Sequence, residues 1–159
     1  MKQHTNRIER NSPVLSAETV VDFSGIEAAV LLEARDGTPL SVIKMRVSQG
    51  KGAPSHVSPE EDKVFQVTDG KFLFLVGASR VEAAAGDCIF VHKGEIHSFR
   101  ALTSNEATMT LVSTPAGHER FFIELSQLTL PHEESKVAEI CRRCAQEIVG
   151  PVVEALPLK

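Results

Sequence analysis

The chain has 159 residues, 42% of them hydrophobic and 24% charged, which is the composition of a globular protein rather than a disordered one. Its formal net charge of −4 and its lack of Trp and Tyr argue against a nucleic-acid partner and against an anionic membrane surface. No apolar run approaches the roughly 20 residues that a membrane-spanning helix needs. The polar N-terminus lacks the apolar core of a signal peptide, so we expect a cytoplasmic protein.

Between residues 27 and 114 the sequence predicts many short strands separated by turn signals. The segment 40–47 alternates apolar and polar side chains with a period of two, as a strand with one buried face does. The glycine- and proline-containing segment 50–54 is predicted to be a loop. Strands are predicted at 28–32, 40–47, 63–68, 71–76, 80–84, 88–91, 96–100 and 107–113. Short strands at this spacing indicate an all-β sandwich or barrel.

After residue 114 the pattern changes from strands to helices. Threonine suits an N-cap and proline the first turn of a helix, so Thr114-Pro115 is expected to open a short helix. A second helix is predicted over 134–149, because its apolar residues have helical spacing and Gly150-Pro151 follows as a stop signal. The predicted organisation is an N-terminal arm (1–26), a β-barrel (27–114) and a C-terminal helical extension (115–159).

The three cysteines are an odd number, which is poor material for a disulfide framework. Cys141 and Cys144 have the spacing of a redox or zinc site, but no second pair of zinc ligands lies nearby. Both lie on the apolar stripe of the predicted second helix. We therefore expect them to pack as small hydrophobic side chains.

Two stretches of the predicted barrel, 54–70 and 86–100, hold most of the side chains that could bind a metal or a ligand. Together they resemble the two conserved motifs of the cupin superfamily, and with the tail residues 114–122 and Gly150-Pro151 most of the chain resembles its single-domain, quercetin-dioxygenase-like type. The first family motif is a Gly, His-x-His, and a Glu seven residues after the first His. The second is a Gly followed by Pro-x-Gly-x-x-His. The resemblance implies a double-stranded β-helix, which is the cupin jelly-roll barrel, with a C-terminal helical tail, and it implies a homodimer.

In the family, the three histidines and the glutamate bind a divalent transition metal, so the resemblance implies His56 and His97 as metal ligands for Fe, Ni, Mn or Zn. Ser58 stands in place of the second motif histidine, Lys63 in place of the glutamate, and His92 in place of the motif proline. Serine is a poor neutral ligand, and a lysine brings positive charge. At ~4 Å and an effective dielectric of ~20, two like unit charges repel by about 4 kcal/mol. We therefore do not expect an ordinary four-ligand metal site.

A third metal ligand could instead come from Glu61, Glu95 or His92. Glu61 would share a strand face with Lys63 if that strand began earlier, and His92 could turn inward at a strand end. Without such a ligand, the two motif histidines are hydrogen-bonded, metal-free side chains of the barrel. By default, the remaining histidines are expected at the surface: His4, His118 and His132.

The position of the Lys63 side chain can be interpreted in two ways. Its ammonium can reach solvent at the barrel mouth, or it can lie inside the barrel and pair with an anionic ligand. Strand alternation places Lys63 on the same face as Phe65, which favours the second interpretation. We therefore predict a ligand pocket formed by Ser58, Lys63, Phe65 and Phe74.

Three functions are compatible with these residues. The first is a small-molecule-binding cupin barrel with a degenerate or altered metal site. The second is a metal-dependent dioxygenase or isomerase resembling the quercetin-dioxygenase-like cupins. The third is a non-catalytic dimeric module with a structural or regulatory role. The sequence assigns no catalytic residue.

Overall fold

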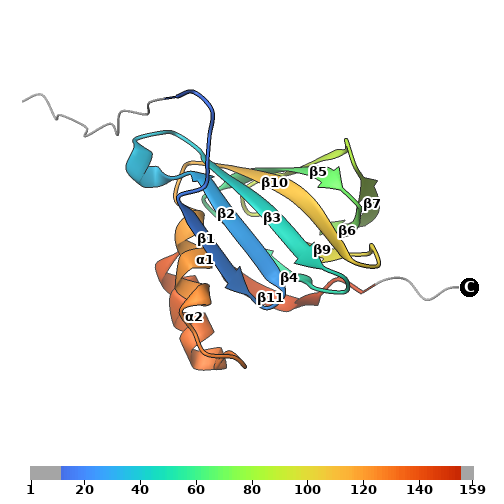
Figure 1. The fold of residues 1–159 in the computed structure, drawn as a ribbon. Coiled ribbons are helices and arrows are strands. Elements are labelled where there is room, and N and C mark those ends of the chain that lie inside the picture. Colours follow the sequence, from blue (N-terminus) through green and yellow to red (C-terminus); the bar gives the residue numbers. More distant parts are fainter. Residues whose placement is uncertain (1–11, 155–159) are drawn as a thin grey trace, which may run out of the picture.

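The computed structural model describes residues 12–154 and shows two antiparallel β-sheets packed face to face (Figure 1). The larger sheet has the strand order β1 (Thr19–Phe23), β2 (Ile26–Leu32), β3 (Ser41–Ser48), β10 (Glu106–Thr114), β5 (Asp62–Asp69), β8 (Cys88–Val91). The smaller sheet has the order β11 (Glu147–Val152), β4 (Gly52–Val57), β9 (His97–Ala101), β6 (Lys71–Val76), β7 (Ser79–Ala84). The predicted all-β fold with a C-terminal helical tail is confirmed.

The core lies between the two sheets, and strand alternation places the apolar side chains there. In β3, Ile43, Met45 and Val47 are completely buried, whereas Lys44 and Arg46 face solvent. An aromatic cluster fills the space between the sheets, with ring centroids 5.4–6.1 Å apart. Its members are Phe65, Phe72, Phe74 and Phe99.

Three strands lie where the sequence predicts none: β1, β4 and, in the C-terminal region, β11 (Glu147–Val152). Strand β1 falls within the predicted N-terminal arm and extends the larger sheet by pairing with β2. Strand β4 includes much of the predicted loop 50–54. A Cβ at Gly52 would lie 1.8 Å from the carbonyl oxygen of Phe99 in β9. Glycine at this position therefore reflects the close approach of two strand backbones rather than a loop.

The C-terminal region contains two helices, but both differ from the prediction. Thr114-Pro115 ends strand β10 instead of opening a helix, and helix α1 spans Glu119–Ser126 after the N-cap residue His118. Helix α2 spans Glu134–Arg143, so the predicted helix over 134–149 is wrong in its last third.

Strand β11 replaces the end of the predicted second helix. The chain leaves α2 through Ala145, whose φ of 49° lies in the left-handed region. The β-branched Ile148 and Val149 then suit an extended strand. Pro151 is tolerated because β11 is the edge strand of its sheet. A single hydrophobic period therefore does not distinguish this helix from the strand that follows it.

The tail packs onto the barrel beside β1 (Figure 1). Phe122 of α1 stacks on Phe23 of β1, with ring centroids 5.2 Å apart. In α2, Ile140 and Cys141 are buried, and the C-cap residue Cys144 is partly buried, as a packing role for the cysteines predicts. Between residues 12 and 154, no helix is long and apolar enough to cross a membrane.

Candidate functional site

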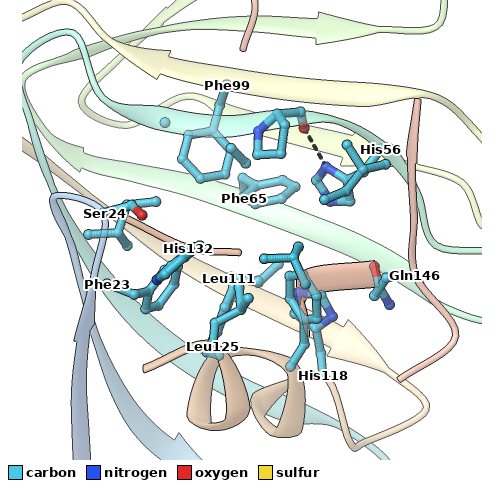
Figure 2. A pocket seen from close by; sticks show the side chains of 18 residues that line it. Phe23, Ser24, His56, Phe65, Phe99, Leu111, His118, Leu125, His132 and Gln146 are labelled. Atoms are coloured by element: carbon cyan, nitrogen blue, oxygen red, sulfur yellow. Dashed lines mark hydrogen bonds between the residues drawn. The ribbon is translucent and has the colours of Figure 1, made fainter. Parts of the chain in front are cut away.

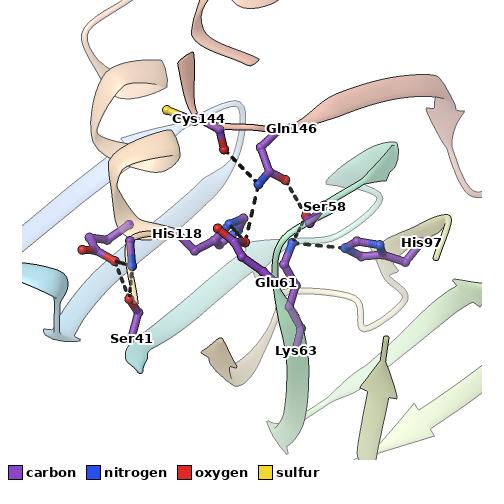
Figure 3. A network of polar contacts seen from close by, with 10 residues as sticks. Ser41, Ser58, Glu61, Lys63, His97, His118, Cys144 and Gln146 are labelled. Carbon is purple, nitrogen blue, oxygen red and sulfur yellow. Dashed lines mark hydrogen bonds and ion pairs between the residues drawn. The ribbon is translucent and has the colours of Figure 1, made fainter. Parts of the chain in front are cut away.

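A buried lysine lies at the centre of the barrel. Lys63 of β5 is only 1% exposed, and its Nζ donates a hydrogen bond to Ser58 Oγ at 2.6 Å and lies 3.2 Å from His97 Nε2 (Figure 3). Ser58 Oγ in turn donates to Gln146 Oε1 at 2.5 Å. We call these four side chains, Ser58, Lys63, His97 and Gln146, the polar centre. The ammonium thus lies inside the protein, surrounded by neutral acceptors.

The two motif histidines are held by equivalent backbone contacts. His97 Nδ1 lies 2.9 Å from the carbonyl oxygen of Glu95, and His56 Nδ1 lies 2.7 Å from that of Pro54. A carbonyl oxygen can only accept, so Nδ1 carries the ring proton in both histidines and Nε2 carries the lone pair. Strand pairing between β4 and β9 places the two rings with centroids 4.1 Å apart. His97 Nε2 therefore accepts a hydrogen bond from the Lys63 ammonium.

Burial sets the charge state of this region. It lowers the pKa of Lys63 to about 8, against the opposing effect of the negative charge on Glu61. Burial, reinforced by the charge of Lys63, lowers the pKa of His97 to about 3. The same two causes hold the pKa of His56 well below its ordinary value. At neutral pH the lysine is mostly charged, and both imidazoles are neutral.

A carboxylate and a third histidine lie beside the polar centre. Glu61 Oε2 lies 2.8 Å from His118 Nδ1 and 3.5 Å from Gln146 Nε2 (Figure 3). Burial acts to raise the pKa of Glu61, but the contact with His118, the charge of Lys63 and the Gln146 amide together lower it. Burial and the charge of Lys63 lower the pKa of His118, although Glu61 opposes them. An ionised Glu61 thus faces a neutral His118.

The expectation that His118 lies at the surface is wrong, because its side chain is buried. It precedes α1, and the return of the tail onto the barrel carries it inward. His132, in the segment before α2, is partly buried and also contributes to a cavity. His4 lies outside the described residues.

A cavity of about 220 Å³ lies between the barrel and the tail (Figure 2). Its polar contributors are His56 from β4, His118 before α1, His132 and Gln146 from the tail, and Ser24. Apolar side chains form most of the rest of its wall: Phe23, Phe65, Phe99, Leu111, Phe122 and Leu125. We refer to this space as the cavity.

The predicted ligand-binding residues divide between these two regions. Phe65 lines the cavity, whereas Phe74 lies behind it in the core, with its ring centroid 5.4 Å from that of Phe65. Ser58 and Lys63 belong to the polar centre and do not line the cavity. The sequence therefore indicates residues near the site without separating the polar centre from the cavity.

The three candidates for a third metal ligand lie apart from His56 and His97 or are otherwise engaged. Glu61 contacts His118, as described above. His92 is exposed, with its ring packed against Phe90 at a centroid distance of 4.5 Å. The Glu95 carboxylate accepts a hydrogen bond from the His92 backbone N–H at 3.3 Å. Only the backbone carbonyl of Glu95 touches a motif histidine.

Sequence reasoning missed two site residues, both in the tail. Gln146 falls within the predicted second helix, where nothing marks it as a site residue, yet it contacts both Ser58 and Glu61. For His118 the one available signal was the apolar pair Phe121 and Phe122, which shows that the following helix has a face to bury. Both residues reach the site only because the tail folds back.

The described side chains do not fit a divalent metal. Within residues 12–154, no group of three or more His, Cys, Asp and Glu side chains is placed to hold one. The lone pair of His97 that would bind a metal accepts from Lys63, and the ammonium repels a second cation at this short range. The chemistry that this region supports is hydrogen bonding and proton exchange at imidazole, carboxylate and ammonium groups.

Comparisons with known proteins agree with this architecture. Residues 43–113 match the family model described as "Cupin domain". No curated protein matches. KdgF from Halomonas sp. is a similar solved structure, with a TM-score of 0.58, 17% identity, and coverage of 64% of this chain and 90% of that chain.

Two further solved structures are similar. A predicted oxalate decarboxylase from Thermotoga maritima has a TM-score of 0.59 and 20% identity, and the match covers 64% of this chain and 98% of that chain. A sugar phosphate isomerase from a cupin superfamily, from Silicibacter pomeroyi, has a TM-score of 0.52 and 20% identity. The match covers 63% of this chain and 71% of that chain. At such identities the likeness concerns the fold. Together with the two-sheet topology, these matches show that the chain has the fold of its cupin neighbours, with residues 43–113 matching the cupin domain model.

Proposed function

We propose that this chain is a small-molecule-binding cupin protein in which the buried ammonium of Lys63 takes the place of a metal ion. The single observation that carries the proposal is the 3.2 Å contact between Lys63 Nζ and His97 Nε2. Lys63 stands at the motif position where the resemblance implies a metal-binding glutamate. A cation fixed to the protein chain therefore engages the imidazole that would otherwise bind the metal.

The contacts around Lys63 support a permanent role for this charge. A buried ion is tolerated only when hydrogen bonds and an opposite charge compensate for its lost hydration. Ser58 and Gln146 link the ammonium to the carboxylate of Glu61 through hydrogen bonds of 2.6, 2.5 and 3.5 Å. Lys63 is thus compensated from within the protein and needs no bound anion.

The neighbouring cavity supports a small organic ligand. Its wall is mostly apolar with a few polar side chains, which is the composition of ligand sites in general. Its volume of about 220 Å³ favours a small molecule over a macromolecular segment. Two of the solved neighbours are named for reactions of small molecules, an isomerase and a predicted decarboxylase.

A metal-dependent dioxygenase or isomerase of the quercetin-dioxygenase-like type is the alternative. It needs a third protein ligand beside His56 and His97. Within the described residues, no contact of Glu61, His92 or Glu95 directs a carboxylate or imidazole to that pair. We therefore give this alternative second place.

We also propose that the protein is a cytoplasmic homodimer. The three cysteines are free thiols, with Cys88 exposed, which suits a reducing compartment. Val64 and Phe90 are cross-strand partners on the outer face of the larger sheet and are 37% and 49% exposed, so they offer apolar area to a second copy. A monomer mass by analytical ultracentrifugation at tens of micromolar would remove the dimer from the proposal.

Elemental analysis tests the metal-free assignment. Protein purified after growth with added Fe, Ni, Mn and Zn is expected to hold far less than one equivalent of any of them. A matched comparison uses His56→Ala in the barrel and His92→Ala at the surface. Stoichiometric metal that is lost in His56→Ala and retained in His92→Ala would overturn the proposal.

A further inference from the structure

Two histidines line the cavity with the same ring nitrogen unengaged (Figure 2). His56 Nδ1 contacts the carbonyl oxygen of Pro54, and His118 Nδ1 lies 2.8 Å from Glu61 Oε2. Among residues 12–154, neither Nε2 has a hydrogen-bond partner, and His118 Nδ1 meets Glu61 Oε2 at ion-pair distance without the alignment of a hydrogen bond. Nε2 is therefore the ring atom that each histidine can offer to a bound molecule.

The contacts at Nδ1 determine what each Nε2 offers. The Pro54 carbonyl requires a proton on His56 Nδ1, as described above. At His118, an ionised carboxylate facing an unprotonated nitrogen would bring lone pairs together, so Nδ1 carries the proton there as well. Burial keeps the pKa of both imidazoles below the ordinary value, so neither ring carries a second proton at neutral pH. Both Nε2 atoms are hydrogen-bond acceptors.

The remainder of the cavity favours a neutral ligand. The Lys63 ammonium belongs to the polar centre and does not line the cavity, so it gives an anion no direct contact. The charge of Glu61, in contact with His118, also disfavours an anion. The Gln146 amide N–H groups are engaged with Glu61 and with the carbonyl oxygen of Cys144 at 3.3 Å. Apart from the Ser24 hydroxyl and the His132 ring, the cavity thus presents acceptors on an apolar wall.

We propose that the cavity binds a neutral, mostly apolar molecule through its hydroxyl group, with His118 Nε2 accepting the hydrogen bond and Glu61 positioning His118. This inference rests on the proposed small-molecule function and names the ligand class for the cavity. A cavity of about 150 Å³ lined by aliphatic and aromatic side chains can hold benzene. The volume of about 220 Å³ therefore admits one six-membered ring with small substituents.

Matched pairs of probes test the ligand class. Phenol is compared with anisole, and cyclohexanol with methoxycyclohexane, by titration calorimetry or ligand-observed NMR. In each pair only the hydroxyl compound can donate to an imidazole, so it is expected to bind about tenfold more tightly than its methyl ether. Equal affinities within both pairs, or no binding of any probe, would overturn the inference. Neither result bears on the metal content, which elemental analysis measures independently.

Substitutions at Glu61 and His118 test the roles assigned to these two side chains. In Glu61→Gln the amide can donate to Nδ1, which favours the other His118 tautomer with a proton on Nε2. The hydroxyl preference should then fall toward onefold, and the ¹⁵N resonance of Nε2 should change from pyridine-like to pyrrole-like. His118→Phe should also lose the preference, and Glu61→Gln keeps the inference testable if His118→Phe does not fold.

The surface variant His92→Asn is the control and should retain the wild-type preference, because His92 is exposed and lies outside the cavity. An unchanged ¹⁵N pattern and an unchanged hydroxyl preference in Glu61→Gln would show that Glu61 does not position His118.

Discussion

His97 and His56 make the same backbone contact but belong to two different regions. Each donates from Nδ1 to a carbonyl two residues earlier, and each is therefore the same neutral tautomer. His97 Nε2 is occupied by the Lys63 ammonium in the polar centre. His56 Nε2 has no partner within the described residues and lines the cavity.

A lysine in place of the motif glutamate is therefore enough to give two neighbouring imidazoles, His56 and His97, different partners. In the metal-binding pattern that the resemblance implies, both would be ligands of one ion. Here the polar centre is closed, because its cation belongs to the chain and its hydrogen bonds end within the protein. The cavity remains open to a ligand.

The largest effect is expected from restoring the metal-binding pattern with Ser58→His and Lys63→Glu together. The change removes a charge that repels a dication by about 8 kcal/mol at ~4 Å in an effective dielectric of ~20, and it supplies two further ligands. Affinity for Zn²⁺ or Ni²⁺, measured by titration calorimetry, should rise on the order of 10⁵-fold. Ser58→His alone retains the ammonium and should remain a weak binder. No gain in the double variant would show that Lys63 is not what closes the polar centre to a metal.

Acid should destabilise the protein through His97. The folded-state pKa of about 3 lies below the unfolded value of 6.5, so the unfolded chain binds more protons between these two pH values. The stability that neutral His97 contributes is complete above pH 6.5 and is lost as the pH falls toward 3, by about 5 kcal/mol in all. Urea unfolding at pH 7.5, 6.5 and 5.5 measures the slope. His97→Gln should be less acid-sensitive than the wild type, and an equal slope in both would contradict this assignment.

Alkaline pH should have the opposite, smaller effect through Lys63. Its folded-state pKa of about 8 lies below the unfolded 10.5, so in this interval too the unfolded chain binds more protons. The cost of burying the charge is present below pH 8 and relieved by pH 10.5, which amounts to about 3 kcal/mol. The unfolding free energy of the wild type relative to Lys63→Met should therefore rise from pH 8 to 10.5. A flat difference between the two would place the ammonium in contact with water.

The smallest effect is expected at the barrel rim. His92 is exposed and its ring packs against Phe90, so His92→Gln should change the unfolding free energy by less than ~0.5 kcal/mol at each pH. The acid slope should match that of the wild type. A slope reduced as in His97→Gln would mean that surface and buried histidines contribute alike.

The barrel was predictable from sequence because its strands alternate with a period of two, as Ile43, Met45 and Val47 do. The close approach of Gly52 to Phe99 was not, because a glycine required by a neighbouring backbone has the same appearance in sequence as a turn glycine. Strand β11 was missed because its apolar residues continue the period of the preceding helix.

The candidate site could be predicted from sequence only for the residues that fall in the two motif-like segments. His56, Ser58, Lys63 and His97 fall in two segments whose pattern resembles that of a cupin, so their proximity could be expected. The pairing of Lys63 with His97, rather than with a bound anion, depends on side-chain direction and burial. His118 reaches the site through a long-range return of the chain, which local patterns do not encode.

Strand β11 also protects a sheet edge. It pairs with β4, which would otherwise present a row of unpaired backbone N–H and C=O groups to other molecules. β11 itself is a poor template for a further strand, since Pro151 lacks an N–H and the register shifts around Gly150. A chain that ends at Gln146 would therefore expose β4 to intermolecular strand pairing, and its first failure should be aggregation rather than loss of the barrel.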